Sequence, residues 1–287
     1  MAFPQSIFMN DTALLIDARN VLYRSVYASQ MENRHEIKYH CMVIYLRQLA
    51  HWINRFNPRS VHVFWDTPRV KVWRRKIMPG YKDRSTSSYI DNLGDLLESN
   101  TAIAKELLSV LNVRQYYKEE MEADDLIYSA ASLLHPKSSI IVSTDSDLTQ
   151  IPYMISSCQV FDPQKMSIVP VPQQHPAYVK ALMGDKADTI KGYSGIGVKR
   201  SVALLESMQD LQSFLDKRGR ETYHLNLLVT DLSLCPKIHS NRCYVQRMMA
   251  STVEFNKDTI KELIKTHKIV GLDTEYANLV PPFNRLK

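Results

Sequence analysis

The sequence repeatedly places an aspartate at or just after the end of a short apolar run. Thr12–Asp17 (TALLID) and Ser60–Asp66 (SVHVFWD) both end on an acid, and Ser138–Thr144 (SSIIVST) is followed at once by Asp145. Runs this short and this apolar are typical of buried strands. Between and around these runs, apolar residues recur at helical spacing over residues 20–28, 38–56, 93–111 and 122–134. This alternation predicts an α/β fold, a mostly parallel sheet flanked by helices.

Two further features divide the chain. A short strand is expected at Asn112–Tyr117, whereas Ser85–Ser88 (STSS) has the composition of a loop. Four prolines, Pro163, Pro170, Pro172 and Pro176, then precede a largely helical pattern. We therefore expect an α/β part over residues 1–170 and a helical part over residues 171–287.

Composition excludes several classes of protein. No apolar run approaches the roughly 20 residues that a membrane span needs, and the N-terminus has no basic segment before an apolar one, as a secretory signal would. The four cysteines, Cys41, Cys158, Cys235 and Cys243, show no CxxC spacing. We therefore expect free thiols in the reducing cytoplasm, with no membrane segment, disulfide frame or zinc knuckle.

The acids of these segments are expected to meet. In a parallel sheet, sites form where loops leave the carboxyl ends of the strands, which is where Asp17, Asp66, Asp145 and Asp147 are expected. Glu122, Asp124 and Asp125 begin a predicted helix. Asp185 and Asp188 are three residues apart, one helical turn, so both side chains are expected to point the same way.

Any one of these acids alone is more simply a turn former or a helix cap. Together they are harder to explain in that way, because so many carboxylates cannot share a small volume unless cations neutralise them. Oxygen ligands in such numbers, without His or Cys, favour Mg²⁺, for which Mn²⁺ can substitute, over zinc. Two such ions about 4 Å apart suit phosphodiester hydrolysis.

The rest of the chain, outside these nine acids, carries a strong excess of positive charge. The chain carries a net charge of +6, and removing nine of its 30 acids leaves 21 against 36 Lys and Arg, an excess of +15. Such an excess favours a polyanionic partner.

A basic segment follows Asp66 directly. Residues 67–84 (TPRVKVWRRKIMPGYKDR) contain Arg69, Lys71, Arg74, Arg75, Lys76, Lys82 and Arg84. The segment is either a solvated basic face or a phosphate-binding element beside the acids, where cations would offset charge on a scissile phosphate. Trp73 or Tyr81 could stack on a terminal base, although either ring could equally belong to the core.

A glycine-rich segment lies further along the chain. Ile190–Arg200 (IKGYSGIGVKR) holds Gly192, Gly195 and Gly197 ahead of an apolar helical stretch, Val202–Leu205. A tight turn before a helix presents backbone N–H groups to a phosphate, and Lys199 and Arg200 add positive charge. The alternative is a simple connection between two helices. As a phosphate-binding element the segment would read no bases, so recognition of duplex DNA would not depend on sequence.

These motifs, in this order, resemble the 5′-nuclease superfamily. That superfamily includes flap endonucleases, the 5′-nuclease domain of bacterial DNA polymerase I, and bacteriophage exonucleases, among them the enzyme that removes RNA primers. The similarity runs from about Leu14 to Leu205. Its motifs are LLIDARN, VFWD, WRRKIMPGYK, EADD, STDSD and GDKAD followed by GIGVK.

The resemblance implies a PIN-like fold and a role for each motif. Asp17, Asp66, Glu122, Asp124 and Asp125 would serve a first metal ion, and Asp145, Asp147, Asp185 and Asp188 a second. Arg74 and Lys82 would be the catalytic cations. Arg75, Lys76, Tyr81 and the glycine segment would contact DNA. A helix–three-turn–helix is implied at about 184–205, and residues 83–111 are the candidate for an arch over the site.

This sequence departs from the superfamily pattern at three positions without losing a ligand. Ala18 stands where Gly commonly follows the first Asp, Thr189 where Asn commonly follows the last, and Ser194 where Pro is frequent in the hairpin. These changes bear on hairpin geometry and DNA affinity. Beyond about residue 210 no similarity is apparent.

The expected activity is structure-selective 5′-3′ exonuclease or flap endonuclease cleavage that leaves a 5′-phosphate and a 3′-hydroxyl. The expected substrates are branched or nicked duplex DNA and RNA–DNA hybrid. We expect a monomer of bacteriophage origin that acts during replication or repair. A polymerase, a clamp or a single-strand-binding protein would then be partners. The alternatives are a PIN-type ribonuclease, which is usually shorter and lacks the hairpin, and a non-catalytic DNA-binding protein, which has no need of the carboxylates.

Overall fold

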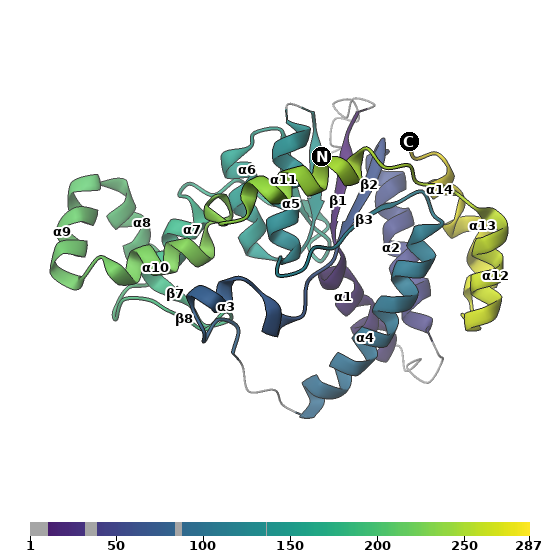
Figure 1. Ribbon diagram of the computed structural model, residues 1–287, viewed down its shortest axis with the longest axis horizontal. Helices are drawn as coiled ribbons and strands as arrows, with labels where there is room; N and C mark the ends of the chain where they lie inside the picture. The colour runs from purple at the N-terminus through teal and green to yellow at the C-terminus, as the bar shows by residue number, and fades with distance from the viewer. Residues whose placement is uncertain (1–10, 32–38, 84–87, 136) are drawn as a thin grey trace.

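A six-stranded sheet with helices on both faces forms the centre of the molecule (Figure 1). The computed structural model describes residues 11–31, 39–83, 88–135 and 137–287, with only the backbone described for residues 88–95. The strands lie in the order β3-β2-β1-β4-β5-β6. Their bounds are β1 Ala13–Asp17, β2 Ser60–Phe64, β3 Arg114–Tyr116, β4 Ser139–Val142, β5 Cys158–Asp162 and β6 Ser167–Ile168. All neighbouring pairs are parallel except β5 with β6, which confirms the predicted fold class.

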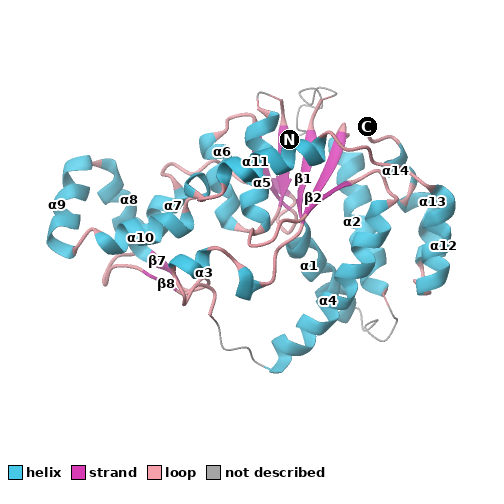
Figure 2. Cartoon of the chain, viewed as in Figure 1, coloured by secondary structure: helices cyan, strands magenta, loops and turns pink. Residues whose placement is uncertain are grey.

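Both faces of the sheet are buried, because apolar side chains alternate into two separate cores. Leu14 and Ile16 of β1 pack into one core with α1 (Ala18–Met31), α2 (His40–Phe56) and α4 (Ser88–Ser109). Leu15 points the other way, toward α5 (Ala123–Leu134), α6 (Gln150–Met154) and α11 (Ile238–Met249). The two helical layers are visible on either side of the strands in Figure 2. Continuous apolar runs are the pattern that a strand covered on both faces requires.

The elements expected from the sequence are present, with small shifts of their bounds. The short strand predicted at residues 112–117 is β3, and the four predicted helices correspond to α1, α2, α4 and α5 with bounds shifted by up to two residues at the ends that overrun them. Strands β5 and β6 are additional to the prediction. Of the predicted loop at 85–88, residues 85–87 lie outside the described residues and Ser88 begins α4. Most of the described part of the candidate arch, residues 83–111, is helix α4.

A second group of helices lies beyond the sheet. It comprises α7 (Pro176–Met183), α8 (Val198–Glu206), α9 (Met208–Arg218) and α10 (Glu221–Thr230), with a two-stranded hairpin, β7 (Gly184–Asp185) and β8 (Ile190–Lys191), after α7. These helices share a small core of their own around Leu182, Tyr193 and Leu215. The short helix α3 (Arg74–Ile77) lies near this hairpin in Figure 1.

The remainder of the chain returns to the sheet. Helix α11 packs on α5, and α12 (Lys257–His267), α13 (Leu272–Leu279) and α14 (Pro281–Asn284) follow. Ile260, Leu272 and Phe283 of these last helices are buried in the same core as α1 and α2. The predicted division at residue 170 stays a prediction, but the residues beyond about 237 contribute apolar side chains to the cores of the sheet.

The glycine segment connects two helices through the hairpin. Gly192 lies so close to α7 that an added Cβ would be 2.1 Å from the Met183 carbonyl carbon. Gly195 has a φ of +77°, a conformation that favours glycine. Asp185 and Asp188 do not lie on a helix as their spacing suggested: Asp185 belongs to β7 and Asp188 to the turn before β8. Gly184, with a φ of +79°, ends α7 and prevents the helix from continuing.

No helix in the described parts of the chain is both long enough and apolar enough to cross a membrane.

The packing of the last helices predicts that they belong to the folding unit of the sheet. Phe283→Ala removes a fully buried ring and should lower the free energy of unfolding by about 3–5 kcal/mol, measured by urea denaturation. Val270→Ala, at a side chain that is 56% exposed, is the matched control and should change it by less than about 0.5 kcal/mol. Equal effects of the two substitutions would contradict this packing.

Candidate active site

A polar cleft opens at the carboxyl ends of the parallel strands. Its volume is about 280 Å³. Six segments line it: the start of α1, the segment after β2, the start of α5, the segment after β4, helix α7 and the β7–β8 hairpin. The lining residues are Arg19, Asp66, Thr67, Arg69, Val72, Lys82, Glu122, Asp145, Ser146, Asp147, Lys180, Asp185, Ala187 and Asp188. Six of the nine predicted carboxylates therefore face one cavity, although they come from distant parts of the sequence.

The strand ends hold a first group of carboxylates in fixed positions. Asp17, the last residue of β1, accepts hydrogen bonds from the Ser143 hydroxyl at 2.8 Å and from the Asn20 N–H at 3.2 Å. Asp66 accepts one at 2.8 Å from the backbone N–H of Ala123, at the start of α5. The two strand ends are adjacent because β1 and β2 are paired in parallel register.

Like charges and burial perturb this first group strongly. Burial raises the pKa of Asp17 to about 7, and the neighbouring carboxylate of Asp66 adds to the rise. The pKa of Asp124 is raised by burial and by the Asp145 and Asp17 carboxylates, and that of Asp66 mainly by burial. Such groups cannot all be ionised at neutral pH without a counter-charge, so the arrangement favours a bound cation.

A second group lies across the cleft, between the segment after β4 and the hairpin. Carboxylate oxygens of Asp147, Asp185 and Asp188 all lie within 4.8 Å of one another, a spacing that one divalent cation can bridge. Burial followed by the charge of Asp145 raises the pKa of Asp147. Lys180 of α7 forms ion pairs with both Asp147 and Asp185. Sequence reasoning missed Lys180, because nothing in its local pattern separates it from an ordinary exposed helix lysine.

Lys82 lies at the cleft and connects the two groups. Its Nζ is 2.6 Å from Glu122 Oε1 and 4.0 Å from Asp188 Oδ1, and its backbone N–H donates to the Asp188 carbonyl oxygen at 2.9 Å. Burial alone would lower the pKa of Lys82, but the charges around it, Glu122 first and then Tyr81 and Asp188, together outweigh burial and raise that pKa, so the ammonium stays charged. Burial would raise the pKa of Glu122, but Arg74 and Lys82 hold it below its usual value.

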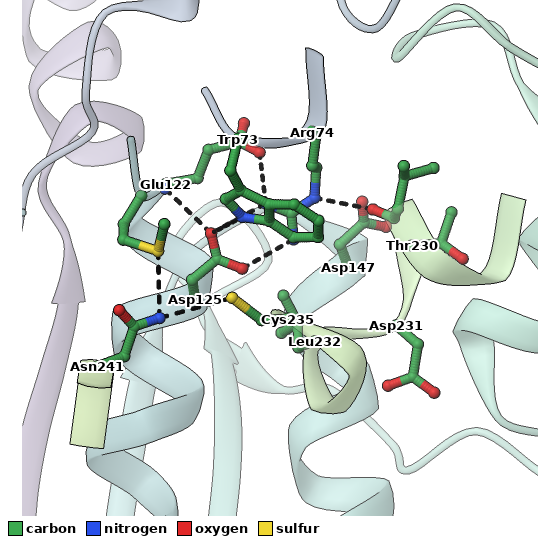
Figure 3. A network of polar contacts seen from close by, with 12 residues as sticks. Trp73, Arg74, Glu122, Asp125, Asp147, Thr230, Asp231, Leu232, Cys235 and Asn241 are labelled. Carbon is green, nitrogen blue, oxygen red and sulfur yellow. Dashed lines mark hydrogen bonds and ion pairs between the residues drawn. The ribbon is translucent and has the colours of Figure 1, made fainter. Parts of the chain in front are cut away.

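Arg74 is buried and does not line the cleft; Figure 3 shows the polar contacts that surround it. Only 3% of this residue is exposed, and its guanidinium donates to Glu122 at 2.7 Å, to Asp125 at 2.9 and 3.0 Å and to the Val229 carbonyl oxygen at 2.8 Å. Asp125, fully buried, also accepts a hydrogen bond from the Trp73 indole at 3.0 Å. Neither Arg74 nor Asp125 is among the residues that line the cleft, and the same holds for Asp17 and Asp124.

Of the two alternatives for the aromatic side chains of the basic segment, stacking on a base or packing in the core, the structure favours the core. The rings of Trp73 and Tyr81 are both buried, at 4% exposure. The Tyr81 hydroxyl lies 3.2 Å from Glu122 Oε2 and 3.2 Å from Asp188 Oδ2, so this side chain supports the carboxylates instead. Tyr81 therefore presents no ring face to DNA, because the core and the acidic site enclose it.

The other predicted DNA contacts lie outside the cleft-lining set. Arg75 donates to the Tyr81 carbonyl oxygen at 2.9 Å, and the exposed Lys76 pairs with Glu120. Gly192, Gly195 and Gly197 form the connection before α8, where Lys199 and Arg200 are exposed. Arg69 of the predicted basic segment also lines the cleft, and so do Arg19 and Thr67, which the sequence analysis had not singled out. For Arg19, its position two residues after Asp17 was the one feature of the sequence that could have indicated a place at the site.

An acidic cleft with buried cations at the carboxyl edge of a parallel sheet is the kind of site found in metal-dependent phosphodiester hydrolases. Residues 12–180 match the family profile of the 5′-3′ exonuclease N-terminal resolvase-like domain. The chain therefore belongs to the 5′-nuclease superfamily.

Named relatives agree with this assignment. A 5′-3′ exonuclease of Aquifex aeolicus is 26% identical over 78% of this chain and 83% of its own length. A flap endonuclease of a Shewanella species is also 26% identical, over 77% of this chain and 90% of its own. A crystal structure of the bacteriophage T5 flap endonuclease with DNA and metal ions covers 90% of this chain and 98% of its own, with a TM-score of 0.64 and 17% identity. That last similarity concerns the fold.

The raised pKa values of the buried carboxylates predict how the free energy of unfolding depends on pH when no metal is bound. The pKa of Asp17 rises from 3.8 to about 7 on folding, so the folded protein binds this proton more tightly than the unfolded chain. The free energy of unfolding in EDTA should therefore increase as the pH falls from about 8 to about 6. Urea denaturation across this range measures it, and a flat or opposite trend would contradict the predicted repulsion.

Proposed function

We propose that this protein is a structure-selective nuclease that hydrolyses phosphodiesters near the 5′ ends of DNA, with two divalent ions bound in the cleft. The observation that carries the proposal is the convergence of carboxylates from separate segments on one cavity that also contains Lys82. The similarity to 5′-3′ exonucleases and to a flap endonuclease supports the choice of substrate.

The carboxylates divide into two ligand sets. Asp17, Asp66, Glu122 and Asp124 would hold the first ion, with Asp145 between the sets, and Asp147, Asp185 and Asp188 would hold the second. The raised pKa of Asp17 and the 4.8 Å span of the second group fit this division. All are hard oxygen donors, which favours Mg²⁺, with Mn²⁺ as a substitute. When bound, the two ions would activate water and neutralise charge on the leaving oxygen.

The cations have different parts in this proposal. Lys82, which lines the cleft, would bind the scissile phosphate and stabilise the charge that develops on it. Arg74 and Asp125 would act as positioning residues, because Arg74 holds Glu122 in place from behind. This differs from the role that resemblance alone implied for Arg74, and the burial of its side chain is the reason.

The hairpin and its glycine connection would bind the duplex. The exposed side chains of Lys199 and Arg200, next to the N-terminus of α8, would contact backbone phosphates without reading bases. Branched or nicked duplexes and RNA–DNA hybrids are the proposed substrates, and the products would carry a 5′-phosphate and a 3′-hydroxyl. Bacteriophage origin, a monomeric state and replication partners belong to the same proposal.

The experiment is cleavage of a 5′-labelled flap, a nicked duplex and an RNA–DNA hybrid, each with and without Mg²⁺. We expect Mg²⁺-dependent release of products from the 5′ end. Asp145→Asn should abolish cleavage and leave DNA binding intact, because the amide still accepts the hydrogen bond that Asp145 receives from the Asp147 N–H. Cleavage of single-stranded RNA alone would instead support a PIN-type ribonuclease, and binding without cleavage a non-catalytic protein.

Lys82→Met tests the phosphate-binding role. It removes the charge and keeps much of the length of the side chain, so turnover should fall by about 10²–10³-fold, while duplex affinity changes by less than about threefold. Lys71→Met is the matched control, since Lys71 is an exposed lysine that pairs with Glu119 and does not line the cleft. Single-turnover rates and filter binding separate the two effects, and equal losses of rate and affinity would exclude a catalytic role.

A further inference from the structure

One lysine contacts two of the three carboxylates of the second group. Lys180, on the last turn of α7, places its Nζ 2.6 Å from Asp185 Oδ2 and pairs with Asp147 Oδ1 as well. Its side chain is 17% exposed, so the ammonium is largely withdrawn from solvent. Asp147 and Asp185 are two of the three residues whose oxygens could hold a metal ion together.

The lysine and a metal ion would therefore need the same two carboxylates, those of Asp147 and Asp185. The three carboxylates of the group have oxygens within 4.8 Å of one another. A divalent ion among them would sit where the ammonium now meets Asp147 and Asp185. Two cations in such a small volume repel each other, so both cannot keep these contacts.

We propose that Lys180 is a built-in counter-ion of the second acidic site, which neutralises that site in the metal-free protein and must swing away before a divalent ion binds. This inference rests on the proposed function, because it takes Asp147, Asp185 and Asp188 as metal ligands. Its consequence is that the second site fills at a higher free metal concentration than its carboxylates alone would require.

The side chain is suited to this exchange. A lysine has a flexible four-carbon stem and carries its charge at a single point, so it can leave the carboxylates without a change in the backbone. Lys180 also lines the cleft, so the released ammonium stays in a region where an anionic substrate would bind.

A purely structural role makes a different prediction. Lys180 precedes Asp185 by five residues, and its ion pair joins α7 to the hairpin. If that link were its whole purpose, removing the charge would destabilise the protein equally with and without metal. It would also leave metal affinity unchanged or weaken it.

The test has two measurements on the whole protein. Titration calorimetry measures the affinity for Mn²⁺, and thermal unfolding in EDTA and in excess Mg²⁺ measures the Tm. Lys180→Met should tighten the weaker Mn²⁺ site by about tenfold, because the ion no longer displaces two ion pairs. The variant should melt below the wild type in EDTA and show a larger gain in Tm on adding Mg²⁺. Unchanged or weaker Mn²⁺ binding, or an equal loss of Tm in both conditions, would overturn the proposal.

The matched control is Lys186→Met, which removes the same charge from an exposed lysine on the hairpin turn beside Asp185. General electrostatics would tighten Mn²⁺ binding in both variants alike, whereas the proposal requires the effect at Lys180 alone. Lys180→Arg keeps the charge and should stay near wild-type affinity. If Lys180→Met does not fold, Lys180→Gln removes the same charge with a polar side chain and should give the same tightening.

Asp185→Asn separates failure of this inference from failure of the proposed function. Loss of the weaker Mn²⁺ site in this variant would support the assignment of Asp185 as a ligand. If that site is lost but Lys180→Met binds Mn²⁺ as the wild type does, only the counter-ion role of Lys180 fails. If the wild type binds no Mn²⁺ that Asp185→Asn affects, the proposed ligand set itself fails.

Discussion

The mutual repulsion of carboxylates at one edge of the sheet is the constraint on which the rest of the structure depends. Parallel pairing brings the ends of β1 and β2 together, so Asp17 and Asp66 are neighbours although 48 residues separate them in the sequence. Burial intensifies their repulsion, as the raised pKa of Asp17 indicates. A fold that concentrates negative charge in this way requires cations close by, and the neighbouring elements supply them.

Three cationic side chains that contact the carboxylates of the site differ in how deeply they are buried. Arg74 is fully buried and binds Glu122 and Asp125 from behind, Lys82 lies at the cleft, and Lys180 lies between Asp147 and Asp185. Removing either partner of a buried pair leaves an uncompensated charge, which is costly. Arg74 is therefore tied to the integrity of the site, whereas the side chains of Lys82 and Lys180, 24% and 17% exposed, are less deeply buried.

The helices α7 to α10 and the helices α12 to α14 have different relations to this site. The hairpin after α7 contributes Asp185 and Asp188 to the cleft, and the Asn226 side-chain amide of α10 donates to the carbonyl oxygens of Ala181 and Lys191 on either side of that hairpin. Helices α12 to α14 instead pack into the core beside α2, away from the cleft. The residues beyond 210, for which the sequence suggested no role, thus brace the hairpin and complete the cores of the sheet.

The sequence by itself determined the α/β class and the strands that end in acids, because these follow from local apolar patterning, and motif order singled out the candidate carboxylates. It misjudged Asp185 and Asp188 as helical, since a three-residue spacing does not reveal the left-handed Gly184 that ends α7. Only the tertiary structure decided which cations face the cleft. Arg74 and Lys82 are eight residues apart in one basic segment, yet one is buried and the other lines the cavity. That difference depends on the contacts of Arg74 with α5 and α10. The placement of Lys180 depends in the same way on its pairing with Asp147 and Asp185. Neither could be read from the sequence, because burial and charge pairing arise between segments that no local pattern connects.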